Sequence, residues 1–136
     1  MATVELRFSA SPEHVRTARL VAAAVARRAG VDESVLDELR LAVGEACSRA
    51  VGLHALHGLE TPVRVSLTEG EKTFTIEVGD DAPHTVPTPR DGSAADSADE
   101  LGLAVISGLV DDVDVTADEH GGLIRMTWPA VPAIVS

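Results

Sequence analysis

Hydrophobic residues recur with a helical period across the middle of the chain, between residues 32 and 57. At about 100° per residue, six positions fall on one stripe: Leu36, Leu39, Val43, Ala46, Ala50 and His54. Such a stripe predicts a helix that lies on a core. The opposite side carries a second set of residues: Glu38, Glu45, Arg49 and Gly52. We expect Asp32 to cap this helix and Gly58 to end it.

The residues before this helix predict a strand and then another helix. From Val4 to Phe8, apolar and charged residues alternate, which is typical of a half-buried strand. Ser11 then provides an N-cap, and Pro12 suits the first position of a helix. The helix should run from about Pro12 to Ala29 and end at Gly30.

After residue 62 the apolar period changes to two, which indicates strands. Apolar and polar residues alternate over 63–68 and again over 73–78, so we expect a hairpin with a tight turn at 69–72. A helix over 101–110 is followed by a strand at 113–117. A turn at Gly121-Gly122 then leads into a last strand at 123–128.

Residues 80–99 form the longest stretch without an apolar period and are rich in proline and aspartate. A segment of this length inside a compact domain is typically a binding loop or a lid. We therefore expect a mobile lid at about 80–100.

The order of these elements predicts the fold class. Strands that follow one another without a helix between them pair as hairpins, so the sheet should be mixed and mostly antiparallel. Three helices remain to cover it. We expect a two-layer α/β sandwich with the helices on one face, built as one domain over residues 1–136.

Composition limits the partners of this chain. The formal net charge is −11, from 22 acidic and 11 basic residues, which argues against direct nucleic-acid binding, a process driven by Lys and Arg on phosphates. No segment approaches the roughly 18 apolar residues of a membrane span. Cys47 is the only cysteine, so an intramolecular disulfide is excluded and we expect a reducing cytoplasm and a buried thiol.

Four motifs, in order and spacing, resemble those of one family: LDELRLAVGEACSRAV at 36–51, VGDDAP at 78–83, ELGLAVISGLVDDVDV at 100–115 and HGGLIRMTWP at 120–129. The chain thus resembles the anti-sigma regulatory factors of the RsbW type. These are serine kinases that share an ATP-binding fold with histidine kinases, gyrase and Hsp90. The resemblance covers nearly the whole chain and implies the histidine-kinase-like ATPase fold.

The resemblance also implies roles for single residues. Glu45 takes the place of the base that acts on a serine hydroxyl, and Asp80 that of the acceptor for the adenine amino group. Three backbone N–H groups, at Leu101, Gly102 and Leu103, would lie near the phosphates, and Gly121 completes the nucleotide contacts. ATP and Mg²⁺ are the implied cofactors. The implied partners are a sigma factor and an anti-sigma-factor antagonist, together with a second copy of the chain, because relatives dimerise through the sheet and first helix.

Two positions depart from the family pattern. Arg49 stands where the family has an asparagine that holds the metal, and arginine has no lone pair to give a cation. Ala82 stands where the first glycine box has a glycine. We therefore predict no metal ligands and a degenerate ATP site in a protein that acts by binding its partners. The alternative is an active ATP- and Mg²⁺-dependent serine kinase in which Arg49 contacts phosphate directly.

Simpler interpretations exist for the same residues. Glu45 and Arg49, four residues apart, are also an ordinary helix-surface ion pair that stabilises by about 0.3 to 0.5 kcal/mol. His54 and His57 have a spacing that zinc sites use, but no cysteine or carboxylate spacing completes a tetrahedral set.

Overall fold

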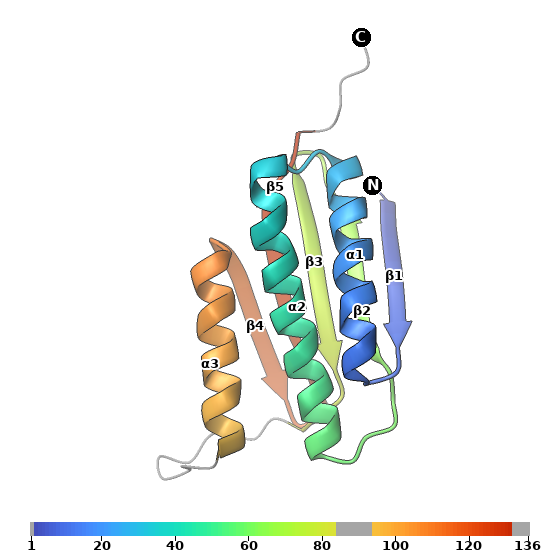
Figure 1. Cartoon of the computed structure of the whole chain (residues 1–136), viewed down its shortest axis with the longest axis vertical. Coiled ribbons are helices and arrows are strands. Elements are labelled where there is room, and N and C mark those ends of the chain that lie inside the picture. The colour runs from blue at the N-terminus through green and yellow to red at the C-terminus, as the bar shows by residue number, and fades with distance from the viewer. Residues whose placement is uncertain (1, 84–93, 132–136) are drawn as a thin grey trace.

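The computed structural model describes residues 2–83 and 94–131, and side chains over 3–83 and 102–131. Five strands form one sheet, and three helices lie together on one of its faces (Figure 1). The elements are β1 (Ala2–Phe8), α1 (Pro12–Ala29), α2 (Glu33–Leu56), β2 (Val63–Glu69), β3 (Thr73–Asp80), α3 (Ala94–Leu109), β4 (Asp112–Asp118) and β5 (Gly121–Pro129). The predicted two-layer α/β sandwich is confirmed.

The sheet has the strand order β1-β2-β3-β5-β4, and every neighbouring pair is antiparallel. β3 lies in the middle and pairs with β2 on one side and β5 on the other, with Val78 opposite Val65 and Ile124. α3 and β4 separate β3 from β5 in the sequence, yet β5 lies beside β3 and β4 takes the outer position in the sheet. The free end of β3 therefore lies between β2 and the start of β5, below α2.

The core lies between the sheet and the helices, and among the described side chains α2 contributes more buried residues to it than α1 or α3. Fully buried strand residues include Leu67, Phe74 and Ile76, and Leu39 and Val43 cover them from α2. The predicted apolar stripe of this helix is confirmed, because all six of its residues are buried. One consequence is that the Glu45 face of α2 turns away from the middle of the sheet and toward α1, α3 and the end of β3.

The helix ends show the local chemistry that the sequence predicts, with one exception. Asp32 caps α2, and its carboxylate accepts hydrogen bonds from the Ser34 N–H and hydroxyl, which hold the pKa of Asp32 below its ordinary value. Gly30, at a φ of 100°, ends α1. The exception is Ser11: its side chain accepts no cap hydrogen bond and donates instead toward Glu13. The fixed φ of Pro12 starts α1.

Two boundaries differ from the prediction. α3 begins at Ala94 rather than near residue 101, because alanines favour a helix and acidic residues suit its first turns. Residues 84–93 of the expected lid lie outside the described part of the chain. Gly121-Gly122 is not the turn between the last strands: both residues belong to β5, and the Asp118 carboxylate closes the turn by accepting from the His120 and Gly121 N–H groups.

Among the described residues, no helix is long and apolar enough to cross a membrane.

Candidate functional site

A buried carboxylate and a buried guanidinium meet at the end of β3. Asp80 is the last residue of this strand, and only 2% of its side chain is exposed. Arg49 reaches it from α2 with a side chain that is 6% exposed, and its Nη1 lies 3.8 Å from Asp80 Oδ2. The other carboxylate oxygen, Oδ1, accepts a hydrogen bond of 2.9 Å from the Ala82 N–H. Both oxygens of Asp80 therefore have partners inside the protein.

The backbone at Asp80 is held by a close contact with the start of β5. Gly121 adopts a φ of 156°, and a Cβ built on it would lie 2.3 Å from the Asp80 carbonyl oxygen. No side chain fits there without moving the backbone. The sequence prediction made Gly121 a nucleotide contact, and the structure gives it a packing role beside Asp80. Ala82, two residues after Asp80, is fully buried.

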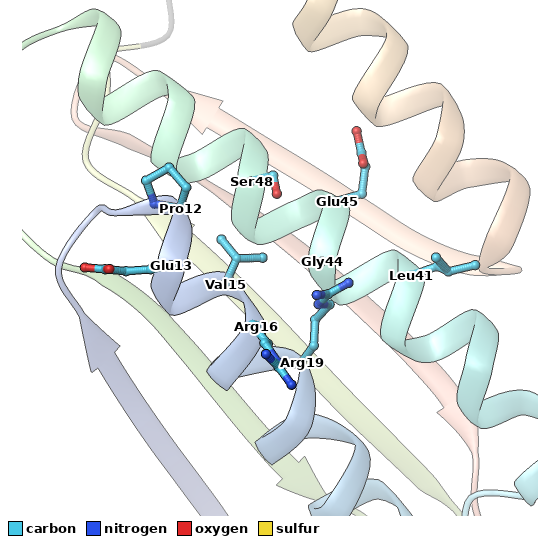
Figure 2. A pocket seen from close by; sticks show the side chains of 9 residues that line it. All are labelled: Pro12, Glu13, Val15, Arg16, Arg19, Leu41, Gly44, Glu45 and Ser48. Carbon is cyan, nitrogen blue, oxygen red and sulfur yellow. The ribbon is translucent and has the colours of Figure 1, made fainter.

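Glu45 lies one turn before Arg49 on α2 and faces α3. A Cβ at Gly102 would lie 3.3 Å from Glu45 Oε1, so the glycine lets α3 pass close to this carboxylate. Figure 2 shows the Glu45 side chain pointing from α2 toward the neighbouring helix. The structure thus brings Glu45 beside Gly102, while Arg49 pairs with Asp80. The simpler interpretation, a helix-surface pair between Glu45 and Arg49, does not describe Arg49, whose buried side chain reaches across to Asp80 on the sheet.

The predicted phosphate contacts at residues 101–103 are not at a helix start. Because α3 begins at Ala94, the N–H groups of Leu101, Gly102 and Leu103 lie in its interior, where backbone donors bond to the preceding turn. Leu103 is half-buried against the core, and the side chain of Leu101 lies outside the described residues. These three groups do not offer the free donors of a helix N-terminus.

A second ion pair, which the sequence pattern does not predict, holds the chain just after Asp80. Arg64 on β2 donates to the Asp81 carboxylate at 2.7 Å and also lies over Gly79. The hydrogen bond from Arg64, helped by the Thr61 hydroxyl and opposed by partial burial, holds the pKa of Asp81 below its ordinary value. Arg64 occupies a solvent-facing position in the period of β2, and only the pairing of β2 with β3 shows its partner.

A groove of about 560 Å³ runs between α1 and α2 on the side away from the sheet (Figure 2). Its walls include Arg16 and Arg19 from α1, with Gly44 and Ser48 from α2. A Cβ at Gly44 would lie 2.7 Å from Arg19 Cδ, so the glycine leaves room for Arg19 to lie against α2. The groove therefore presents two guanidinium groups on a protein whose net charge is −11.

The site formed by Asp80, Arg49 and Ala82 at the end of β3, called here the Asp80 corner, does not fit Mg²⁺. The position implied for a metal ligand is an arginine whose guanidinium has only donors, and it already lies against Asp80. In the described part of the chain, no three His, Cys, Asp or Glu side chains are grouped to hold a metal ion. Asp80, the residue implied for the adenine contact, accepts from the Ala82 N–H through Oδ1 and faces Arg49 through Oδ2.

Comparison with known proteins places this geometry in context. Residues 8–128 match the family described as the histidine kinase-like ATPase domain. The serine-protein kinase RsbW of Bacillus pumilus (strain SAFR-032) is 31% identical over 140 residues, with 91% of this chain and 83% of the relative covered. The RsbW of Oceanobacillus iheyensis is 27% identical, with coverage of 91% and 84%.

A solved structure has a similar fold. It contains the RsbU and RsbW domains of Rv1364c from Mycobacterium tuberculosis and superposes with a TM-score of 0.71 at 16% sequence identity. The match covers all of this chain and 34% of that longer chain. At this identity the similarity concerns the fold alone.

Proposed function

The chain belongs to the histidine kinase-like ATPase domain family, on the branch of the RsbW serine-protein kinases, and we propose that it is an anti-sigma regulatory factor with a degenerate ATP site. In this proposal it controls transcription in the cytoplasm by binding a sigma factor, an anti-sigma-factor antagonist or both in turn. Partner exchange does not depend on phosphotransfer by this chain.

The observation that carries the proposal is the buried contact between Arg49 and Asp80. A carboxylate reads the adenine amino group by accepting from it, and a guanidinium is a permanently charged competitor with five donors. Arg49 also repels a divalent cation at the position where the family's metal ligand stands. Arg49 thus disfavours binding of both the adenine ring and the Mg²⁺ ion of Mg²⁺-ATP.

We assign partner binding to the groove between α1 and α2. Arg16, Arg19, Glu13 and Glu45 all line this groove, and Figure 2 shows the two glutamates pointing away from the two arginines. The surface between the arginines therefore favours a partner segment that brings acidic side chains to them. Charged residues at such a surface set the association rate and the choice of partner.

A homodimer is part of the proposal. In the described part of the chain β1 pairs only with β2, so the outer edge of β1 is open. Three of its apolar residues, Val4, Leu6 and Phe8, are only partly buried, and a cavity of about 140 Å³ lies between this strand and α1. An open edge with apolar neighbours suits pairing with the same strand of a second copy.

The alternative, an active serine kinase, is favoured by Glu45. This carboxylate lies next to Gly102 of α3, in the position that the family resemblance gives to the base. For that function Arg49 must leave Asp80 when nucleotide binds.

Partner binding measured with and without nucleotide tests the proposal. Purified sigma factors and antagonists from the same genome are titrated with the protein in buffer containing EDTA, and again with ATP and Mg²⁺. We expect equal affinity in both buffers and no phosphate transfer to the antagonist. Arg19→Glu should weaken binding at least tenfold, whereas Arg28→Glu, an exposed control on the same helix, should not. Binding that requires ATP, or phosphorylation of the antagonist, contradicts the proposal and supports the kinase.

A further inference from the structure

His54 is fully buried and forms two hydrogen bonds that join three segments of the chain. It lies in the last turn of α2. Its Nδ1 is 3.0 Å from the carbonyl oxygen of Thr61, just before β2, and its Nε2 is 3.0 Å from the backbone nitrogen of Asp81, just after β3. The buried imidazole therefore links α2 to the segment before β2 and to the segment after β3.

The partners of His54 determine which ring nitrogen carries the proton. The Asp81 N–H can only donate, so Nε2 must accept. The Thr61 carbonyl can only accept, so Nδ1 must carry hydrogen and donate. His54 is therefore the neutral ring with its hydrogen on Nδ1. A proton on Nε2 would face the Asp81 N–H and remove that hydrogen bond.

The amide that His54 accepts from belongs to the peptide group between Asp80 and Asp81. The carbonyl of the same peptide group lies against Gly121, where a Cβ would come within 2.3 Å of the oxygen. One peptide plane is thus held at its N–H by α2 and at its C=O by β5. The orientation of this plane sets the direction of the Asp80 side chain, which leaves the backbone immediately before it.

We propose that His54 is a positioning residue that holds Asp80 against Arg49 through the Asp80–Asp81 peptide group. The inference concerns the internal geometry of the corner and holds whether or not a partner or nucleotide binds there. Replacing the acceptor at Nε2 frees the peptide plane to turn, and Asp80 then loses its alignment with Arg49.

The charges around the ring are compatible with this role. The Asp81 carboxylate accepts from the Arg64 guanidinium at 2.7 Å, and the Asp80 carboxylate faces Arg49. The two carboxylates that flank the Asp80–Asp81 peptide group therefore each have a cation. His57, the C-cap residue of α2, is exposed to solvent and provides a matched control.

Nuclear magnetic resonance tests the proton assignment on the unmodified protein. Long-range ¹H–¹⁵N correlation at pH 7 should show a protonated Nδ1 and an unprotonated Nε2 for His54, whereas His57 should show the averaged signals of an exposed ring. A proton on Nε2 of His54, with or without one on Nδ1, would overturn the proposal.

Two substitutions separate the two hydrogen bonds. The side-chain oxygen of glutamine reaches the place of Nε2, so His54→Gln keeps the acceptor for Asp81. The shorter asparagine reaches only the place of Nδ1, so His54→Asn keeps the donor to Thr61. Each lost bond should lower the folded-to-unfolded ratio about fivefold, and His57→Asn should leave that ratio unchanged.

The coupling between Arg49 and Asp80 distinguishes positioning from simple stabilisation. It is measured by a double-mutant cycle in urea with Arg49→Met and Asp80→Asn, repeated in each His54 background. The coupling should persist in His54→Gln and largely vanish in His54→Asn, together with the hydrogen-exchange protection of the Asp81 amide. Equal coupling in the two backgrounds, whether retained or lost in both, would overturn the proposed role of Nε2.

Discussion

Removal of the Arg49 guanidinium should strongly destabilise the protein. Arg49→Met keeps most of the length and apolar volume of the side chain but leaves Asp80 buried without its cation, since only 2% of Asp80 is exposed. Breaking a buried ion pair by removing one partner costs roughly 3 to 5 kcal/mol. The Nη1 to Oδ2 distance of 3.8 Å is long, and Asp80 keeps the Ala82 hydrogen bond, so we expect the low end of this range.

A loss of about 3 kcal/mol is large for a domain of 136 residues. With an unfolding entropy of about 2.1 cal/mol/K per residue, it lowers the melting temperature by roughly 10 °C. Replacing both partners should restore much of the loss, because Arg49→Met with Asp80→Leu removes both charges of this pair together. A pair that lay in solvent would instead contribute at most about 1 kcal/mol.

Urea unfolding followed by tryptophan fluorescence measures these differences. Trp128 is the only tryptophan and is buried in β5, so its emission should change when the sheet opens. Arg40→Met is the matched control, because Arg40 lies on the same helix and pairs with the exposed Asp37. A cost below about 1 kcal/mol for Arg49→Met, or additive effects of the Arg49 and Asp80 substitutions, would refute the reasoning.

Three further results should follow from the same structure. Gly121→Ala should destabilise the protein by about 2 to 4 kcal/mol in urea unfolding, because its Cβ meets the Asp80 carbonyl. Gly52→Ala should stabilise it by about 0.5 to 1 kcal/mol, because a Cβ at this helical position meets nothing within 4 Å. A stabilising Gly121→Ala or a destabilising Gly52→Ala would contradict this geometry. Burial raises the pKa of the Cys47 thiol to about 12, so a thiol reagent at pH 8 should label the protein only after urea is added, and rapid labelling of the native form would show an exposed thiol. The pKa of Asp81 is lowered, so its pairing with Arg64 stabilises the protein above the unfolded pKa of about 3.9, and this stabilisation is lost as pH falls through the folded pKa. Asp81→Asn should therefore lower the stability at pH 7 and change it little at pH 2. An equal loss of stability at both pH values would contradict this assignment.

The sequence predicted the layers and the polar face of α2 because both depend on local periodicity. The stripe from Leu36 to His54 and the alternation in β2 and β3 predict helices on one face of a mixed, mostly antiparallel sheet, and in the structure every neighbouring pair of strands is antiparallel. Periodicity places Glu45 and Arg49 on the polar face of α2 with Glu38 and Gly52, and only the family resemblance distinguishes the two from an ordinary surface pair.

The contacts of the site could not be read from the sequence, because they depend on pairing between distant segments. Arg49 meets Asp80 only because β5 and β2 enclose β3 and hold its end below α2. Gly121 is required by the backbone of Asp80, 41 positions earlier in the chain. The helix start at Ala94 was missed because alanine and aspartate give no apolar period, although both are compatible with a first turn.

Calorimetric titration with ATP and Mg²⁺ tests the central claim, that Arg49 prevents nucleotide binding by pairing with Asp80. The unmodified protein should give no binding heat up to millimolar ATP, and Arg49→Asn should gain binding that EDTA abolishes, while the Arg40→Asn control should gain none. Micromolar binding of Mg²⁺-ATP by the unmodified protein would contradict the claim, because Arg49 would then be compatible with the nucleotide.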